Sequence, residues 1–182
     1  RYLKRKPRVV QQYKYQWQPK LMTVWTDTDY AGCVKTRKST SAGVIQLGSH
    51  IIKSWSSTQS VIALSSGEAE YYGMVRGGSM ALGLRSILRD LGIEKDIVMK
   101  TDASAAKGMG SRRGLGKVRH IEVNQLWLQD KVGTGEIALE KVSGERNIAD
   151  GLTKHVEGAK VHWAIKANNQ VVRGGRHILA PE

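Results

Sequence analysis

Four acidic side chains stand where a strand ends or a helix begins. Asp27 and Asp102 each follow a short strand-like run of residues. Glu70 lies in the first turn of a long helical pattern, and Asp150 opens a later helical stretch. In open α/β sheets, binding sites lie beyond the carboxyl ends of the strands. We therefore expect these four carboxylates to converge at one edge of a sheet.

Such a cluster of acids has a specific chemistry. Crowded carboxylates repel one another and raise one another's pKa values unless cations join them. Ligand sets made only of oxygen select hard ions, Mg²⁺ or Mn²⁺. Two such ions about 4 Å apart suit an in-line displacement at phosphorus. The chain has 29 Lys and Arg residues against 16 Asp and Glu, a net charge of +13 that favours nucleic acid. Cleavage of a phosphodiester is therefore the predicted activity.

Three of the acids also have structural explanations. Asp27 could be a turn-former, and Asp29 is a rival for its role, because alternation along a strand places both on the same face. Asp102 could instead be the N-cap of the helix that follows it. Asp150 could be an ordinary acid that favours a helix N-terminus. The order of the four acids along the predicted elements favours the catalytic interpretation.

The fourth acid, Glu70, has its rival two residues earlier in the same helix. Ser65 and Glu68 have the spacing of a capping box, in which hydroxyl and carboxylate each accept from a backbone N–H. Residues two apart on a helix point about 200° apart, so Glu68 and Glu70 cannot serve one site. We expect the Glu68 side chain to cap the helix and point outward, and the Glu70 side chain to face the sheet. The small residue Gly73 follows Glu70 one helical turn later.

The element order predicts a mixed sheet with helices on its faces. A hairpin meander comes first, and strands joined by helical crossovers follow. Strands are predicted at residues 21–26, 42–47, 51–56, 96–101 and 136–142, and helices at residues 65–91, 103–107, 118–132 and from 147 onward.

The chain divides into a central domain, residues 21–155, and two basic flanks. Residues 1–20 interleave basic and aromatic side chains, which could grip a nucleic-acid backbone and stack bases, or could be the end of an upstream helix and a linker. The chain begins without Met, as a piece of a longer polypeptide would. Residues 156–182 form a basic C-terminal tail without an assigned role. No apolar run is long enough to span a bilayer, and the single Cys33 excludes an internal disulfide.

The motifs, taken in order, resemble those of the RNase H domain of a copia-type retrotransposon Pol polyprotein, which follows the reverse transcriptase. The resemblance covers about residues 1–155. Its matching stretches are residues 26–33, 36–41, 54–59, 63–72, 101–105, 119–122 and 147–154, and Arg1-Tyr2-Leu3-Lys4 resembles the end of the polymerase part.

The resemblance implies an α/β fold: an RNase H-like five-stranded mixed sheet whose first three strands are antiparallel. It implies hydrolysis of the RNA strand of an RNA–DNA hybrid, with Asp27, Glu70, Asp102 and Asp150 holding two Mg²⁺ (or Mn²⁺). It also implies an upstream reverse transcriptase as partner, no membrane contact, and an intracellular setting, in a cytoplasmic retrotransposon particle, the nucleus or both.

Further expectations concern the substrate and turnover. Many RNases H carry a histidine before the last acid that helps product leave, and residues 143–146 have none, whereas His120 is expected to be structural. In an integrase-type core the catalytic glutamate would follow two aspartates in the sequence, whereas Glu70 is the second of the four acids here. The alternative is an inactive remnant that binds nucleic acid without cutting it. Candidate contacts to the hybrid are Arg37, Lys38, Ser39, Thr40, Arg112, Arg113 and Lys117.

Overall fold

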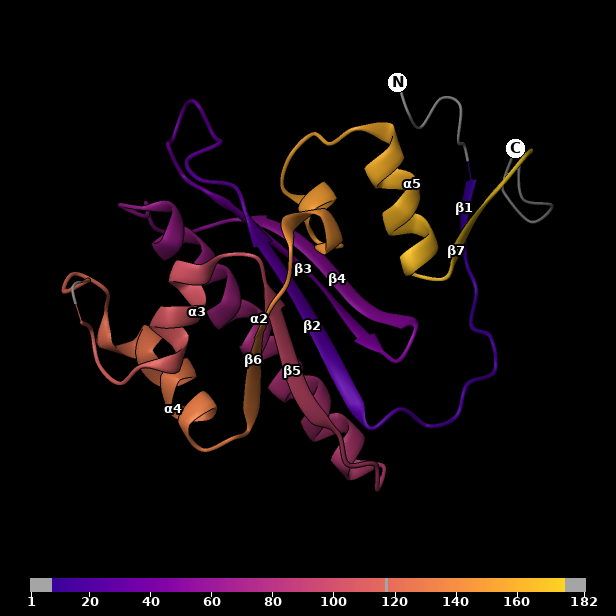
Figure 1. Cartoon of the computed structure of the whole chain (residues 1–182), viewed down its shortest axis with the longest axis horizontal. Helices are drawn as coiled ribbons and strands as arrows, with labels where there is room; N and C mark the ends of the chain where they lie inside the picture. The colour runs from indigo at the N-terminus through magenta and orange to yellow at the C-terminus, as the bar shows by residue number, and fades with distance from the viewer. Residues whose placement is uncertain (1–7, 117, 176–182) are drawn as a thin grey trace.

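A five-stranded mixed sheet forms the centre of the molecule (Figure 1). The computed structural model describes residues 8–116 and 118–175. The strand order is β4-β3-β2-β5-β6, in which β4, β3 and β2 are antiparallel and β5 and β6 run parallel to β2. This confirms the predicted fold. The strands are β2 (Leu21–Thr28), β3 (Thr40–Leu47), β4 (His50–Thr58), β5 (Asp96–Thr101) and β6 (Ile137–Lys141).

Helices cover both faces of this sheet. The long helix α2 lies across one face, with α3 and α4 beside it over β6. A short 3₁₀ turn, η3, and the C-terminal helix α5 lie over the other face, next to β3 and β4. The helices are α2 (Ser66–Asp90), α3 (Ser104–Ser111), α4 (Trp127–Gly133) and α5 (Gly158–Ala167), with 3₁₀ turns η1 (Val123–Leu126), η2 (Gly144–Arg146) and η3 (Asp150–Leu152).

Glycines in α2 bring that helix close to β2. A Cβ at Gly73 would lie 2.4 Å from Thr28 Oγ1, and one at Gly77 would lie 2.8 Å from Thr26 Cγ2. Without these glycines the helix would have to move away from the strand that carries Asp27. The glycines that lower helix propensity in the sequence therefore fix the distance between Glu70 and the sheet.

Replacing Gly73 with alanine is expected to destabilise the fold by about 1–3 kcal/mol, because the added methyl group clashes with a buried strand. Gly83→Ala is the matched control in the same helix, since a Cβ there meets nothing within 4 Å. That substitution is expected to stabilise the helix by about 0.5–1 kcal/mol. Urea unfolding of the two variants measures both changes, and equal stability of the two would contradict the packing described.

Two predicted helices differ from the structure. Helical structure expected over residues 118–132 begins only at Val123, because the preceding residues form a turn. The helix expected from Asn147 is a single 3₁₀ turn, η3. The Asn147 side chain is used elsewhere: Nδ2 donates to the Thr26 carbonyl at 2.8 Å, and Oδ1 accepts from the Ala149 N–H at 3.1 Å.

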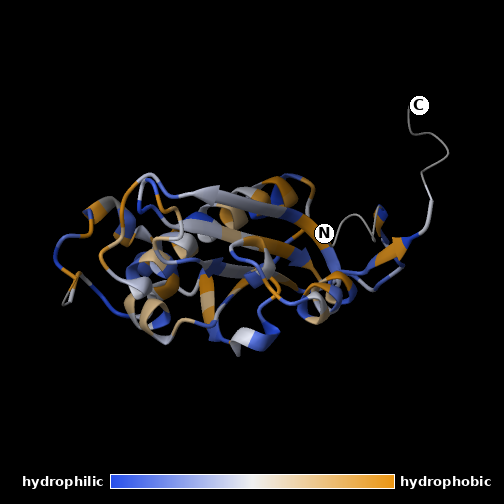
Figure 2. Ribbon diagram, turned by 90° about the horizontal axis from the view of Figure 1, so that it is seen from above, coloured by the Kyte–Doolittle hydropathy of each residue, from blue (hydrophilic) through white to orange (hydrophobic). Residues whose placement is uncertain are grey.

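A second, two-stranded sheet joins the two ends of the described chain. Strand β1 (Arg8–Gln11) pairs antiparallel with β7 (Gln170–Arg173), and this ribbon lies at one end of the molecule (Figure 2). A buried hydrogen bond of 2.7 Å from Gln46 Nε2 in β3 to Asn168 Oδ1 attaches it to the larger sheet. No helix in the described part of the chain is long and apolar enough to cross a membrane.

Candidate active site

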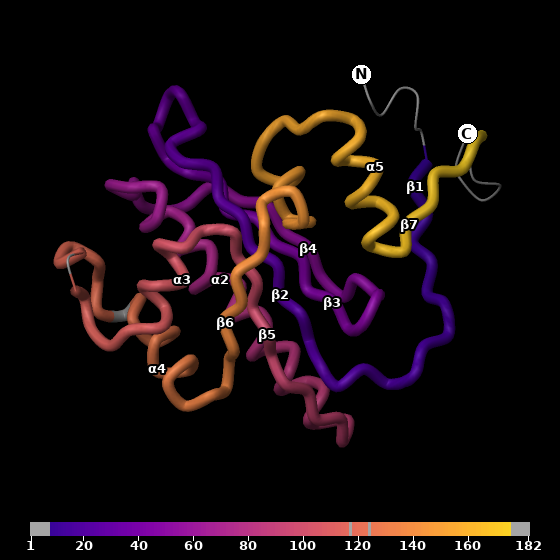
Figure 3. Tube along the Cα trace, viewed as in Figure 1, coloured from indigo at the N-terminus to yellow at the C-terminus, as the bar shows by residue number. Residues whose placement is uncertain are grey.

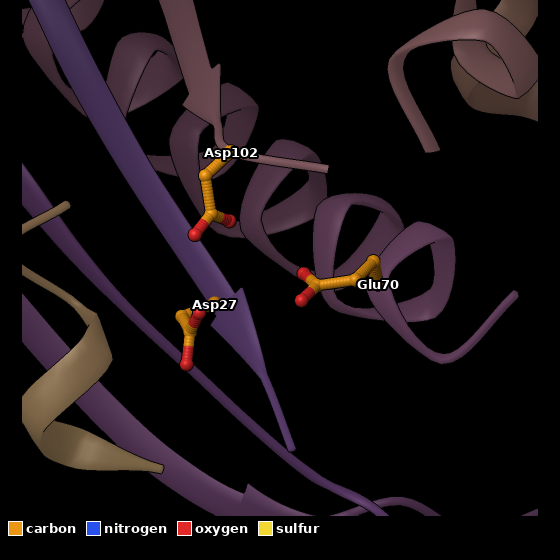
Figure 4. Close-up of side chains that lie close together, drawn as sticks. All are labelled: Asp27, Glu70 and Asp102. Atoms are coloured by element: carbon orange, nitrogen blue, oxygen red, sulfur yellow. The ribbon is translucent and has the colours of Figure 1, made fainter. Parts of the chain in front are cut away.

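Three of the four predicted acids meet at one edge of the sheet. Asp27 is the last residue but one of β2, and Asp102 directly follows β5, the parallel neighbour of β2. Glu70 reaches them from the N-terminal part of α2. Their carboxylates point toward one another (Figure 4), and one oxygen from each lies within 4.8 Å of the other two. Side chains separated by up to 75 positions, from residue 27 to residue 102, thus form one cluster.

Burial makes this cluster electrostatically unfavourable without a cation. Glu70 is desolvated and faces the charges of Asp27 and Asp102, which together raise its pKa to about 8. Burial also raises the pKa of Asp27, partly opposed by a hydrogen bond from the Thr153 hydroxyl and by the charge of Lys154. One oxygen of Glu70, Oε2, is buried and has no hydrogen-bond partner among the described residues. A buried carboxylate oxygen without a donor fits a metal ligand.

The structure separates Asp27 and Asp102 from their structural alternatives. Asp29, the rival of Asp27, accepts a hydrogen bond from the Thr40 backbone N–H, and its own N–H donates back to the Thr40 carbonyl at 3.0 Å. It therefore closes the end of the β2–β3 pair. Asp102 is not the N-cap of α3, since that position belongs to Ala103.

Glu68 has the capping role predicted for it, but its expected outward orientation is wrong. The Ser65 hydroxyl accepts from the Glu68 N–H at 3.2 Å, while Glu68 Oε2 accepts from the Leu64 N–H at 3.0 Å instead of from the N-cap residue. Glu68 is only 1% exposed, and the Tyr72 hydroxyl and His120 Nε2 bind its carboxylate at 2.9 and 2.7 Å. His120 thus closes a polar cluster separate from the three acids.

Asp150 lies beside the cluster but is not one of the three residues that share it. Its carboxylate forms ion pairs with Lys154, four residues later, and with Lys160 of α5. Burial alone would raise the pKa of Asp150, but hydrogen bonds from the two ammonium groups outweigh it and lower that pKa. The Thr153 hydroxyl contacts both Asp27 and the Asp150 carbonyl, which places the fourth acid next to the first.

Lys154 and Lys160, which pair with Asp150, were not predicted from the sequence. The Asp150–Lys154 pair has the i, i+4 spacing of side chains that meet on a helix, and this spacing could have revealed it. Lys160 gave no such signal, because it meets Asp150 only when α5 docks on the sheet. Its Nζ also donates to the Gly144 carbonyl at 2.9 Å.

Replacing Lys160 with methionine is expected to destabilise the protein by about 1–3 kcal/mol, because a buried carboxylate and a carbonyl both lose a charged donor. Lys166→Met, on the exposed side of the same helix, is the control and is expected to change stability by less than about 0.5 kcal/mol. Thermal unfolding at neutral pH compares the two variants. Equal melting temperatures would show that α5 does not support Asp150.

The first predicted substrate loop is only partly available to a ligand. Arg37 is exposed, with a left-handed backbone at φ 56°, while Lys38 and Thr40 are half-buried. Ser39 is only 1% exposed, and its hydroxyl accepts from the Ala31 N–H at 3.0 Å. Ser39 therefore shapes the loop, and its prediction as a contact to the substrate does not fit its burial.

The second predicted loop follows α3. Arg113 is exposed, whereas Arg112 is half-buried and donates from Nη2 to the Leu115 carbonyl at 2.7 Å. Arg112 therefore also holds the loop in shape. Lys117, the third residue predicted here, lies outside the described residues.

Solved structures of similar shape define the class of fold. The N-terminal RNase H domain of Rv2228c from Mycobacterium tuberculosis superposes with a TM-score of 0.51 at 19% identity, covering 80% of this chain and 96% of that one. LC11-RNase H1, isolated from compost by a metagenomic approach, gives a TM-score of 0.51 at 16% identity, covering 73% and 92%. The protein has the RNase H fold.

The proteins that are similar to this chain in sequence are transposon polyproteins. The chain is 31% identical over 134 residues to the retrovirus-related Pol polyprotein from transposon TNT 1-94 of Nicotiana tabacum, across 72% of this chain and 10% of the polyprotein. It spans about a tenth of the length of the curated relatives it matches. No protein-family model matches it. Its sequence relatives are therefore retrovirus-related Pol polyproteins of plant copia-type transposons, and its structural neighbours are RNase H domains, as its motifs predicted.

Proposed function

We propose that this domain is a metal-dependent endonuclease that hydrolyses the RNA strand of RNA–DNA hybrids during reverse transcription of a retrotransposon. The observation that carries the proposal is the convergence of Asp27, Glu70 and Asp102 within 4.8 Å at the end of two parallel strands. A cluster of buried carboxylates on a chain of net charge +13 suits a cation and a phosphodiester together.

The three clustered acids are the proposed ligands of two Mg²⁺ or Mn²⁺ ions, and Asp150 is the proposed fourth. When bound, such ions activate water and stabilise the leaving oxygen at phosphorus. The chain's own part is to hold the carboxylates together before the ions arrive. Gly73 and Gly77 set the position of Glu70 against the sheet, and the Thr153 hydroxyl orients Asp27.

The pairing of Asp150 with two lysines favours a second candidate, an inactive remnant that binds nucleic acid. In the structure the ammonium groups of Lys154 and Lys160 occupy both Asp150 oxygens, which a metal ion would otherwise use. If the domain is a nuclease, either the two ammonium groups move away from Asp150 when metal binds, or the other three acids hold the metal ions without Asp150. A cleavage assay on an end-labelled RNA–DNA hybrid, with Mg²⁺ or with EDTA, separates the candidates. Cutting of the RNA strand only with Mg²⁺ supports the nuclease, and intact hybrid under both conditions supports the remnant.

Exposed basic side chains of the two predicted loops are proposed to bind the phosphates of the hybrid. Arg37 and Arg113 are the better candidates, since Arg112 is tied to its own loop. The proposed partner is a reverse transcriptase region that would precede this domain in the same polyprotein and add to its grip on the substrate. The proposed setting is inside the cell.

Neutralising Arg112 and Arg113 together is expected to weaken hybrid binding and flatten its salt dependence, by about 0.9 in the log–log slope for each lost phosphate contact. Arg113→Gln alone should account for most of the change, because Arg113 is exposed. Arg89→Gln is the control, since Arg89 pairs with Glu94 at the far end of α2. Fluorescence anisotropy in EDTA at several salt concentrations measures the slope, and an unchanged slope would contradict the assignment.

A further inference from the structure

One flank of the molecule is built from segments that contain no acidic residue. It consists of residues 8–20, the hairpin region 40–62 and the C-terminal stretch 158–175, and none of the three segments contains Asp or Glu. The three segments contact one another through the β1–β7 pair and through hydrogen bonds to the hairpin. The basic residues on this flank are Arg8, Lys14, Lys20, Lys53, Lys160, Lys166 and Arg173.

The segment that leads from β1 to β2 crosses this flank (Figure 3) and is fixed to it mainly by the Gln16 side chain. Gln16 Nε2 donates to the Leu47 carbonyl at 2.9 Å, and Gln16 Oε1 accepts from the Ser49 N–H at 3.1 Å. The same amide lies 3.0 Å from His50 Nδ1. A loop held in this way presents its neighbouring side chains in a defined direction.

Those neighbours are aromatic and point into solvent. Tyr15 is 84% exposed and Trp17 is 85% exposed, and their ring centroids lie 6.0 Å apart at an interplanar angle of 69°. Tyr13 is 67% exposed and packs edge-on against His50. Large aromatic side chains so exposed, on a fixed loop beside lysines, have the chemistry that stacks unpaired bases and holds their backbone.

This surface is separate from the acid cluster. Trp17 precedes the first residue of β2, whereas Asp27 stands near its last, and a strand of this length extends about 25 Å. A duplex has its bases already stacked on one another, so exposed aromatic rings favour a single strand over a hybrid.

We propose that residues 13–20, with Tyr15 and Trp17 as stacking groups and Lys14 as a backbone contact, bind single-stranded nucleic acid. The surface would hold unpaired template or displaced strand while a hybrid occupies the opposite end of the sheet. Only that last statement rests on the proposed nuclease function. The binding itself needs neither metal nor the three acids.

The test is fluorescence anisotropy of the intact domain in EDTA with two probes. One is a labelled oligothymidylate of about 20 nucleotides, longer than the site of one small binding domain, and the other is a blunt RNA–DNA hybrid of the same length. The double variant Tyr15→Ala/Trp17→Ala is expected to bind the single strand about tenfold more weakly or worse, and the hybrid with little change. Leu91→Ala, which removes an apolar side chain that is 69% exposed at the end of α2, is the control.

The salt dependence of single-strand binding distinguishes aromatic stacking from contacts to the charged backbone. Lys14→Gln is expected to lower the single-strand slope by about 0.7, whereas the aromatic double variant leaves the slope unchanged. Unchanged single-strand affinity in the double variant, or an equal loss with both probes, would overturn the proposal and leave this surface as a contact for protein. Asp102→Asn is expected to keep full single-strand affinity, so failure of the nuclease proposal and failure of this one are distinguishable.

Discussion

Replacing Asp102 with asparagine is expected to reduce cleavage of an RNA–DNA hybrid by about a thousandfold or more, equivalent to about 4 kcal/mol of transition-state stabilisation. Asp102 supplies one of the three carboxylates that meet within 4.8 Å. Asparagine keeps the shape of the side chain but removes the charge that would hold a divalent ion. The initial rate of cleavage at saturating Mg²⁺ measures the effect.

The control for this substitution is Asp130→Asn, which neutralises an exposed acid of α4 away from the cluster. That variant is expected to cut at the rate of the unaltered domain. Circular dichroism should show both variants folded, and hybrid binding in EDTA should persist in both. An Asp102→Asn variant that still cuts at a comparable rate would remove the cluster from the reaction.

Replacing Glu70 with glutamine is expected to stabilise the metal-free protein above pH 8, by about 2 kcal/mol. In the folded protein, burial and the charges of Asp27 and Asp102 raise the pKa of Glu70 from 4.5 to about 8. Between these two values the folded state holds a proton that the unfolded chain has released. The unaltered protein therefore loses stability as pH rises from 4.5 to 8, and glutamine removes that loss.

Chemical denaturation in EDTA at pH 5 and pH 8.5 measures this pH dependence. The stability difference between the two pH values should be smaller in Glu70→Gln than in the unaltered protein. Metal binding has the opposite dependence, since the ion needs the ionised carboxylate, and Mg²⁺ affinity should rise with pH up to about 8. A Glu70→Gln variant with the unaltered pH profile would mean that the Glu70 carboxyl ionises freely in the folded state.

The sequence alone was enough to predict that Asp27, Glu70 and Asp102 meet, because local rules constrain the position of each residue. Strand ends position the two aspartates, and the capping motif Ser65–Glu68 leaves Glu70 as the acid that can face the sheet. The same rules predicted the five strands of the main sheet, and the resemblance to an RNase H domain supplied the antiparallel direction of the first three. The burial of Glu68 was not predictable, because it depends on Tyr72 and on the distant His120.

What the sequence did not predict depends on contacts between distant segments. Lys160 meets Asp150 only because α5 returns across the second face of the sheet, and no local pattern encodes that return. The pairing of β1 with β7 joins segments more than 150 residues apart, and each strand has only four residues. Such short strands give no periodicity from which a partner could be chosen.

The central claim is that the convergence of three acids exists to hold divalent ions. Its most direct test is a crystal of the domain soaked in Mn²⁺ and measured for anomalous scattering. The structure predicts anomalous peaks bonded to carboxylate oxygens of Asp27, Glu70 and Asp102, and Asp102→Asn crystals should lose at least one of them. An unaltered crystal with no peak at these three residues, at a Mn²⁺ concentration that supports cleavage, would contradict the claim.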